Sequence, residues 1–146
     1  MPIAIGVDIG GSHISSAAVN LLTHQTIPGT YHHGEVDSKA SKDEIFKRWA
    51  AVINLTLQEV EENELLGIGV AMLGPFEYRK GIALFEENDK YEALFQVPVG
   101  EEFPKYLLYK DLKLRFLNDA SSFGIGGALS TELKDAKNTI AVTLGT

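Results

Sequence analysis

A short turn whose residue types could do chemistry directly follows an apolar run at the beginning of the sequence. Its residues are Asp8-Ile9-Gly10-Gly11-Ser12. Because glycine has no side chain, Gly10 and Gly11 let the backbone approach an anion closely and adopt positive φ. Successive backbone N–H groups in such a turn form a concavity that binds phosphate. A carboxylate beside phosphates is useful when it holds Mg²⁺ or its water, and Asp8 is placed for that role. The alternative is a plain hairpin turn, in which Gly-Gly is also favoured.

A polar pair, Asn118-Asp119, lies between a short apolar run and a stretch of small residues. We predict that the run, Leu114–Leu117, is a strand and that Asp119–Leu133 is a helix. Open α/β sheets bind their ligands at the carboxyl ends of strands. There, Asp119 could act as a general base and Asn118 could hydrogen-bond a substrate hydroxyl. The alternative is a capping role, since Asn and Asp are among the best helix N-caps.

Two glycine-containing turns follow further apolar runs. Gly74-Pro75 comes after Leu66–Met72, and Gly145-Thr146 comes after Thr139–Leu144. A glycine at a strand end lets a ligand pack on the backbone, and a Gly-Thr turn can bind phosphate. Both turns also fit ordinary chain reversals, for which Gly and Pro are the usual residues.

Strands that could position these turns are predicted along the chain. Ile3–Val7 is rich in β-branched residues, and two more strands, His13–Leu22 and Thr26–Gly34, follow after tight turns. Leu66–Met72 is apolar on both faces, as expected of a central strand flanked by helices. A last strand is predicted over Thr139–Leu144.

One long helix is predicted between these strands. Ser41 and Glu44 form a capping box, an apolar stripe at helical spacing follows, and Asn63 could end the helix. Further along we expect a short hairpin in Phe76–Phe85, a loop over Glu86–Val99 and a short helix over Pro104–Lys110. This order of strands and helices predicts a mixed α/β domain.

Composition narrows the classes of protein. The 146 residues suit one domain, and the formal net charge of −7 with no Lys/Arg cluster argues against nucleic-acid binding. The absence of cysteine excludes disulfides and thiolate zinc sites in this segment. We expect no signal peptide, no membrane span and a cytoplasmic location. The acidity also means that a phosphate site here must rely on backbone N–H groups, a helix end or a metal ion.

Taken in order, these motifs resemble the ROK family of sugar kinases and repressors, within the actin–hexokinase–Hsp70 superfamily. Asp8–Ser12 is similar to the first phosphate motif, Asp-x-Gly-Gly-Thr, with serine in place of threonine. Gly67–Pro75 resembles the Gly-x-Gly-x-Pro-Gly segment whose last glycine lies against the sugar, with leucine where the family usually has proline. Leu117–Ala120 resembles the Asn-Asp-Ala of the catalytic base, and Thr143–Thr146 resembles the start of the second phosphate motif, Gly-Thr-Gly.

The resemblance implies a ribonuclease H-like (actin-like ATPase) α/β domain, with a five-stranded mixed sheet and helices on both faces. Residues 1–146 would then be the N-terminal domain of a two-domain kinase. The adenosine site, a Glu-x-Gly-His sugar segment and a Cys/His zinc cluster would lie in the second domain. The isolated segment is therefore expected to be inactive, and we expect the full-length protein to be a homo-oligomer.

The resemblance also implies residue roles. Asp119 would be the catalytic base, and Asp8 would hold Mg²⁺ through water. The phosphates of ATP would be bound by Gly10, Gly11, Ser12, His13, Gly145 and Thr146. The sugar would be bound by Gly74, Asn88, Asn118 and Asp119. Asn88 stands as the counterpart of a family asparagine in a segment that departs from the family pattern, with Tyr91 as the counterpart of its tryptophan.

The implied activity is ATP-dependent phosphorylation of a hexose or N-acylhexosamine, as in a glucokinase. Two alternatives are a sugar-responsive ROK regulator and a non-catalytic sugar-binding protein. Regulators of this family carry a helix-turn-helix segment before the phosphate motif, whereas here the first strand begins at Ile3. A purely binding site needs no base, so Asp119 argues against the second alternative.

Overall fold

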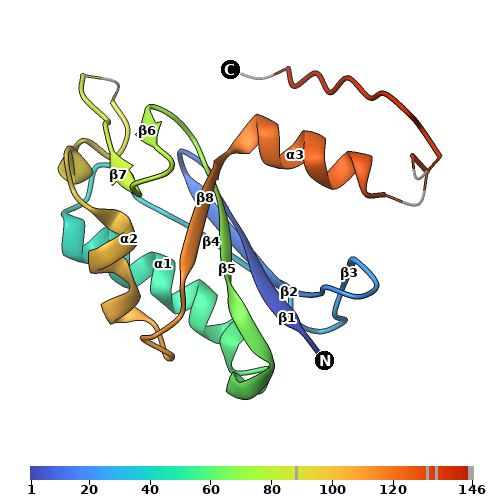
Figure 1. Ribbon diagram of the computed structural model, residues 1–146. Coiled ribbons are helices and arrows are strands. Elements are labelled where there is room, and N and C mark those ends of the chain that lie inside the picture. Colours follow the sequence, from blue (N-terminus) through green and yellow to red (C-terminus); the bar gives the residue numbers. More distant parts are fainter. Residues whose placement is uncertain (88, 131, 134, 145–146) are drawn as a thin grey trace.

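A mixed sheet with two short strands along one edge forms the centre of the computed structural model, which describes residues 1–87, 89–130, 132–133 and 135–144 (Figure 1). The strand order is β3-β2-β1-β5-β8, and β4 also pairs with β2. The strands are β1 (Ile3–Ile9), β2 (His13–Asn20), β3 (Gln25–Thr26), β4 (His32–Glu35), β5 (Leu65–Met72) and β8 (Leu114–Asn118). The predicted α/β class and mixed sheet are therefore confirmed.

The pairing of the central strands decides which residues meet. β1 runs antiparallel to β2 and parallel to β5, and β5 runs parallel to β8. In register, Asp8 pairs with Ala71, and Met72 pairs with Asn118. The carboxyl ends of β1, β5 and β8 consequently lie at the same edge of the sheet.

The predicted third strand, Thr26–Gly34, is divided in two, so the described part of the sheet has six strands rather than five. Pro28 has no N–H to donate, and Gly29 adopts φ +83°. Thr30 then takes over part of the ladder, since the Ala18 N–H donates to its hydroxyl at 3.0 Å. β3 and β4 thus lie on either side of a turn and share one edge of β2.

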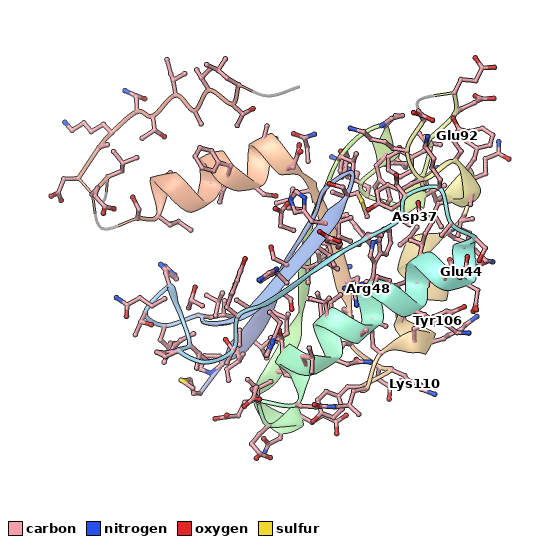
Figure 2. The ribbon with its side chains drawn as sticks, turned by 180° about the vertical axis from the view of Figure 1, so that it is seen from behind. Asp37, Glu44, Arg48, Glu92, Tyr106 and Lys110 are labelled. Carbon is pink, nitrogen blue, oxygen red and sulfur yellow. The ribbon has the colours of Figure 1, made fainter. Side chains whose placement is uncertain are left out.

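Helix α1 (Lys42–Leu57) covers one face of the sheet (Figures 1 and 2). It begins with the predicted capping box, in which the Glu44 N–H donates to the Ser41 hydroxyl and the Ser41 N–H donates to the Glu44 carboxylate. The helix ends six residues before the predicted Asn63, and Glu62–Glu64 form a separate 3₁₀ turn, η1. Arg48 ties the helix to β4 by donating from Nε to the Glu35 carbonyl at 2.6 Å.

The middle of the chain forms small elements that pack on the same side as α1. The predicted hairpin consists of β6 (Phe76–Glu77) and β7 (Ile82–Ala83). The predicted loop contains η2 (Glu92–Leu94) and the beginning of α2 (Val99–Glu102). The predicted helix after Pro104 is reduced to η3 (Phe103–Tyr106). The aromatic side chains of Phe46, Trp49, Tyr91 and Phe103 pack together between α1 and these elements.

Helix α3 (Asp119–Ala128) extends from the end of β8 on the side of the sheet away from α1 (Figure 1). It is shorter than the predicted Asp119–Leu133. The prediction of a strand over Thr139–Leu144 is wrong, because this segment has no strand partner among the described residues. It runs beside α3 instead, where a Cβ added at Gly124 would lie 3.2 Å from that of Ala141. No helix in the described ranges is long and apolar enough to cross a bilayer.

Candidate functional site

The two predicted carboxylates come together at the carboxyl edge of the sheet. Asp8 near the end of β1 and Asp119 at the beginning of α3 both line a hollow of 290 Å³. Ala71 of β5 lies between them on the sheet, and Phe123 and Thr143 border the hollow from α3 and the segment after it. Both carboxylates are exposed, so a ligand in the hollow can reach them.

The charge of Asp119 disfavours the charged form of Asp8 in this hollow. Packing around the Asp8 carboxyl removes water from it and raises its pKa, while His13 lowers the pKa and the charge of Asp119 raises it. A cation would reduce the electrostatic repulsion between these two neighbouring carboxylates. No group of three or more His, Cys, Asp or Glu side chains in the described ranges could hold a metal ion. A Mg²⁺ ion at Asp8 would therefore keep most of its water ligands, as Mg²⁺ commonly does.

The turn of Gly10–Ser12, called here the phosphate turn after its expected ligand, joins β1 to β2. The Gly10 N–H donates to the His13 carbonyl at 2.9 Å, and the Val36 N–H donates to the Ser12 carbonyl at 2.8 Å. The expected positive φ is wrong for both glycines of the turn, because neither is among the glycines with positive φ. Their bare Cα atoms instead make room: a Cβ at Gly10 would lie 3.0 Å from the His13 ring, and one at Gly11 would lie 3.0 Å from the Lys90 side chain.

Tyr91 holds this turn from its buried side. Its ring is fully buried, and its hydroxyl donates to the Gly10 carbonyl at 2.7 Å. Burial raises the pKa of Tyr91 to about 12, so the hydroxyl keeps its proton at neutral pH. From the sequence, Tyr91 was identified only by resemblance, as the counterpart of a family aromatic residue. No local pattern signals this bond, since the two residues lie in distant segments.

Asn118 and Asp119 have different structural roles. Asn118 is the N-cap of α3, because its Oδ1 accepts from the backbone N–H groups of Ala120 at 3.1 Å and Ser121 at 3.3 Å. Asp119 is the first helical residue, and its Oδ1 accepts from the Ala120 N–H at 2.8 Å. The capping alternative therefore applies to Asn118, and the exposed Asp119 carboxylate faces the hollow.

Tyr78 is a second residue that the sequence did not single out. Its hydroxyl donates to the Met72 carbonyl at 2.9 Å and accepts from Asn118 Nδ2 at 3.3 Å. It thereby joins the ends of β5 and β8. A Cβ at Gly74 would lie 3.4 Å from this hydroxyl, which is ordinary contact, and Gly74 itself is exposed.

Three predicted ligand-binding residues, Asn88, Gly145 and Thr146, lie outside the described residues. Of the others, the structure brings Asp8, Asp119 and the phosphate turn to one edge of the sheet. Ser12 and His13 are exposed on the same turn.

Comparison with known proteins shows the fold. No family model and no curated protein matches the chain. A polyphosphate/ATP-glucomannokinase from Arthrobacter sp. strain KM matches 88% of this chain at 19% identity and TM-score 0.63, over 48% of its own length. A ROK family glucokinase from Streptomyces griseus, solved with glucose and AMPPNP, matches 81% at 19% identity and TM-score 0.60, over 33% of its length. A ROK family transcriptional regulator, a homologue of the E. coli MLC protein, matches 93% at 16% identity and TM-score 0.65, over 32% of its length.

The chain therefore has the ribonuclease H-like α/β fold found in the N-terminal part of these sugar kinases, and the regulator shares this fold. It spans about a third to a half of the length of these three structures.

Proposed function

We propose that this chain is the N-terminal half of an ATP-dependent sugar kinase that phosphorylates a hydroxyl of a hexose or N-acylhexosamine. The observation that carries the proposal is the shared hollow of Asp8 and Asp119 beside the glycine turn. A base, a metal-holding carboxylate and a phosphate-binding turn are the parts that phosphoryl transfer to an alcohol requires. The fold shared with sugar kinases supports the same conclusion.

Each residue has a defined task in this proposal. Asp119 accepts the proton of the attacking sugar hydroxyl, because its exposed carboxylate faces the hollow. Asp8 holds Mg²⁺ through water, and the ion supplies positive charge to the γ-phosphate. The turn of Gly10–Ser12 orients that phosphate, through the backbone N–H groups of Gly11 and Ser12 together with the exposed His13. Phosphoryl transfer depends mainly on such positioning and charge neutralisation.

The sugar is placed against the exposed Gly74 and the end of β8. Asn118 uses its Oδ1 as the helix cap and donates from Nδ2 to Tyr78. In this role Asn118 both begins the helix that carries Asp119 and borders the sugar. Asn88 is assigned to the sugar, and Gly145 and Thr146 to the phosphates of ATP, by the resemblance alone.

The remaining parts of the site belong to a second domain of the same protein, which would supply the adenosine site. Closure of the two domains would exclude water, which competes with the sugar for the phosphate. We further propose a cytoplasmic, homo-oligomeric enzyme that binds neither nucleic acid nor membrane. The regulator with this fold keeps a ROK-type regulator open as a second candidate. The exposed carboxylate of Asp119 favours the kinase.

The test is phosphorylation by the full-length protein. Purified enzyme is incubated with Mg²⁺, ATP and a panel of hexoses and N-acylhexosamines, and sugar-dependent ADP release is measured together with the phosphorylated sugar. The proposal expects ADP release with at least one sugar. Tight sugar binding without ADP release would favour the regulator or the non-catalytic sugar-binding protein.

A further inference from the structure

Lys90 lies against the phosphate turn, although the chain carries no cluster of basic residues there. A Cβ built on Gly11 would lie 3.0 Å from Lys90 Cδ and Cε and 3.1 Å from Nζ. The stem and the ammonium group of this lysine therefore cross the Gly11 backbone at van der Waals distance. Lys90 is exposed, so a ligand on the turn can reach its ammonium group.

The backbone beside Lys90 is held in place on both sides. Tyr91 donates from its hydroxyl to the Gly10 carbonyl at 2.7 Å and from its N–H to the Ser38 carbonyl at 2.9 Å. Asp89 donates from its N–H to the Glu92 carboxylate at 3.0 Å, and its own carboxylate pairs with Lys39 at 3.2 Å (Glu92 is labelled in Figure 2). These bonds form a frame that holds the Lys90 backbone beside the phosphate turn.

The frame is built at a conformational cost. Asp89 and Tyr91 both have left-handed backbones, with φ of +62° and +52°. For residues other than glycine, such conformations cost about 1–3 kcal/mol each and persist only where surrounding contacts determine them. Here the buried Tyr91 ring and its bond to Gly10 are those contacts. This segment is therefore shaped to lie against the phosphate turn.

The charges around the turn indicate what the Lys90 ammonium group could do there. The hollow beside the turn already holds the carboxylates of Asp8 and Asp119, which repel a polyphosphate. A lysine ammonium is a compact point charge that binds phosphate oxygens without needing a fixed orientation. At the turn it would offset the repulsion and complement the backbone N–H groups.

We propose that Lys90 binds the terminal phosphates of the nucleoside triphosphate held by the turn of Gly10 and Gly11. This inference rests on the proposed function, which supplies ATP as the ligand. It adds a cation from a distant segment to a site whose other parts are a turn and a metal-holding carboxylate. A side chain at position 11 would press on the end of this lysine, so glycine leaves the lysine its place against the turn.

The experiment measures binding rather than turnover. Calorimetric titrations of the full-length protein use Mg²⁺ with the non-hydrolysable ATP analogue AMPPNP, inorganic tripolyphosphate, and adenosine. Lys90→Ala should weaken AMPPNP and tripolyphosphate about tenfold, as expected for loss of a charge-assisted contact. Adenosine affinity should not change. Lys90→Arg should recover most of the loss.

Lys47→Ala is the matched control, because Lys47 is an exposed lysine of α1 that pairs with Asp43 of the same helix and takes no part in the frame around Lys90. It should leave both affinities within about twofold. Melting temperatures of all variants are measured in parallel, and Lys90→Ala should melt as the wild type does because Lys90 is exposed.

The outcomes separate this inference from the proposed function. If the wild type binds AMPPNP and phosphorylates sugar while Lys90→Ala binds AMPPNP and tripolyphosphate normally, the role of Lys90 is wrong and the kinase stands. An equal loss in Lys47→Ala and Lys90→Ala would also overturn the specific contact, since it would indicate a general effect of charge. If the wild type binds neither AMPPNP nor tripolyphosphate, both proposals fail.

Discussion

Replacing Asp119 by asparagine separates chemistry from structure at the beginning of α3. The structure divides the two roles between neighbours: Asn118 caps the helix, and Asp119 presents its carboxylate to the hollow. Asp119→Asn preserves size and removes only the proton acceptor. Asn118→Ala is the matched variant, because it removes the cap and leaves the carboxylate in place.

Asp119→Asn should change turnover and leave stability nearly unchanged, whereas Asn118→Ala should lower stability. Asp119→Asn loses a favourable charge at a helix N-terminus, worth about 0.3–1 kcal/mol, and relieves repulsion with Asp8, so the two effects largely cancel. Turnover should fall by roughly 10²–10⁴-fold, as is typical for a general base. Asn118→Ala removes the cap acceptor: the Ser121 N–H loses its partner, while the Ala120 N–H keeps its bond to Asp119 Oδ1. This variant should lower the free energy of unfolding by about 0.5–2 kcal/mol.

The assay pairs kcat with chemical unfolding on the same preparations of the full-length protein. Asp119→Asn should unfold within about 0.5 kcal/mol of the wild type while losing turnover. The reasoning is refuted if Asp119→Asn phosphorylates sugar at nearly the wild-type rate with normal stability. It is also refuted if this variant is destabilised as much as Asn118→Ala, since Asp119 would then be part of the cap.

Three further predictions follow from the described contacts. The folded-state pKa of Asp8 is raised, so the free energy of unfolding falls as pH rises through that pKa. Asp8→Asn should therefore stabilise the protein by about 0.5 kcal/mol at pH 7. Denaturant titration at about pH 3, where the carboxyl is protonated in both states, should show no gain. Gly81→Ala should cost about 2 kcal/mol in the same assay, because φ is +69° and the new Cβ would lie 3.2 Å from the Gly100 backbone. The control Gly126→Ala, where an added Cβ would meet nothing within 4 Å beyond its own helix, should instead stabilise by about 1 kcal/mol. Residues 1–146 alone should release no ADP with ATP and hexose, and robust hexose-dependent release by this segment would contradict the two-domain proposal.

The parts of the fold that could be predicted from the sequence are those set by neighbouring residues. The capping box at Ser41 and Glu44 fixes the beginning of α1 because its two hydrogen bonds form within one turn. The predicted end of that helix, at Asn63, was wrong, because the apolar stripe continues past Leu57 although the helix does not. The division of the third strand depends on Thr30 bonding to Ala18, a contact between different strands that no local pattern records.

The last predicted strand failed for a related reason. Thr139–Leu144 has the alternation of a strand, but alternation does not provide a partner. The segment lies beside α3 with Ile140 and Leu144 each 94% exposed. A strand pattern therefore predicts a capacity to pair, and the pairing itself depends on which edge is within reach.

The candidate site was predictable only as far as its motifs are contiguous. Asp8 and Asp119 stand beside a glycine turn and a helix start that the sequence shows directly. Tyr78, Lys90 and Tyr91 approach those motifs from other segments, with a hydroxyl or an ammonium group whose position depends on the folded backbone. Their sequence neighbourhoods have no periodicity that would distinguish them from ordinary loop residues.

The buried aromatic cluster gives the molecule an optical property. Trp49 is the single tryptophan of the chain and is fully buried, with its ring in edge contact with Tyr91 at a centroid distance of 5.4 Å. The hydroxyl of Tyr91 in turn holds the Gly10 carbonyl of the phosphate turn. A ligand that shifts this turn alters the surroundings of one indole two contacts away. We therefore expect the intrinsic fluorescence of Trp49 to respond to a ligand that shifts the turn, with no background from other tryptophans in residues 1–146.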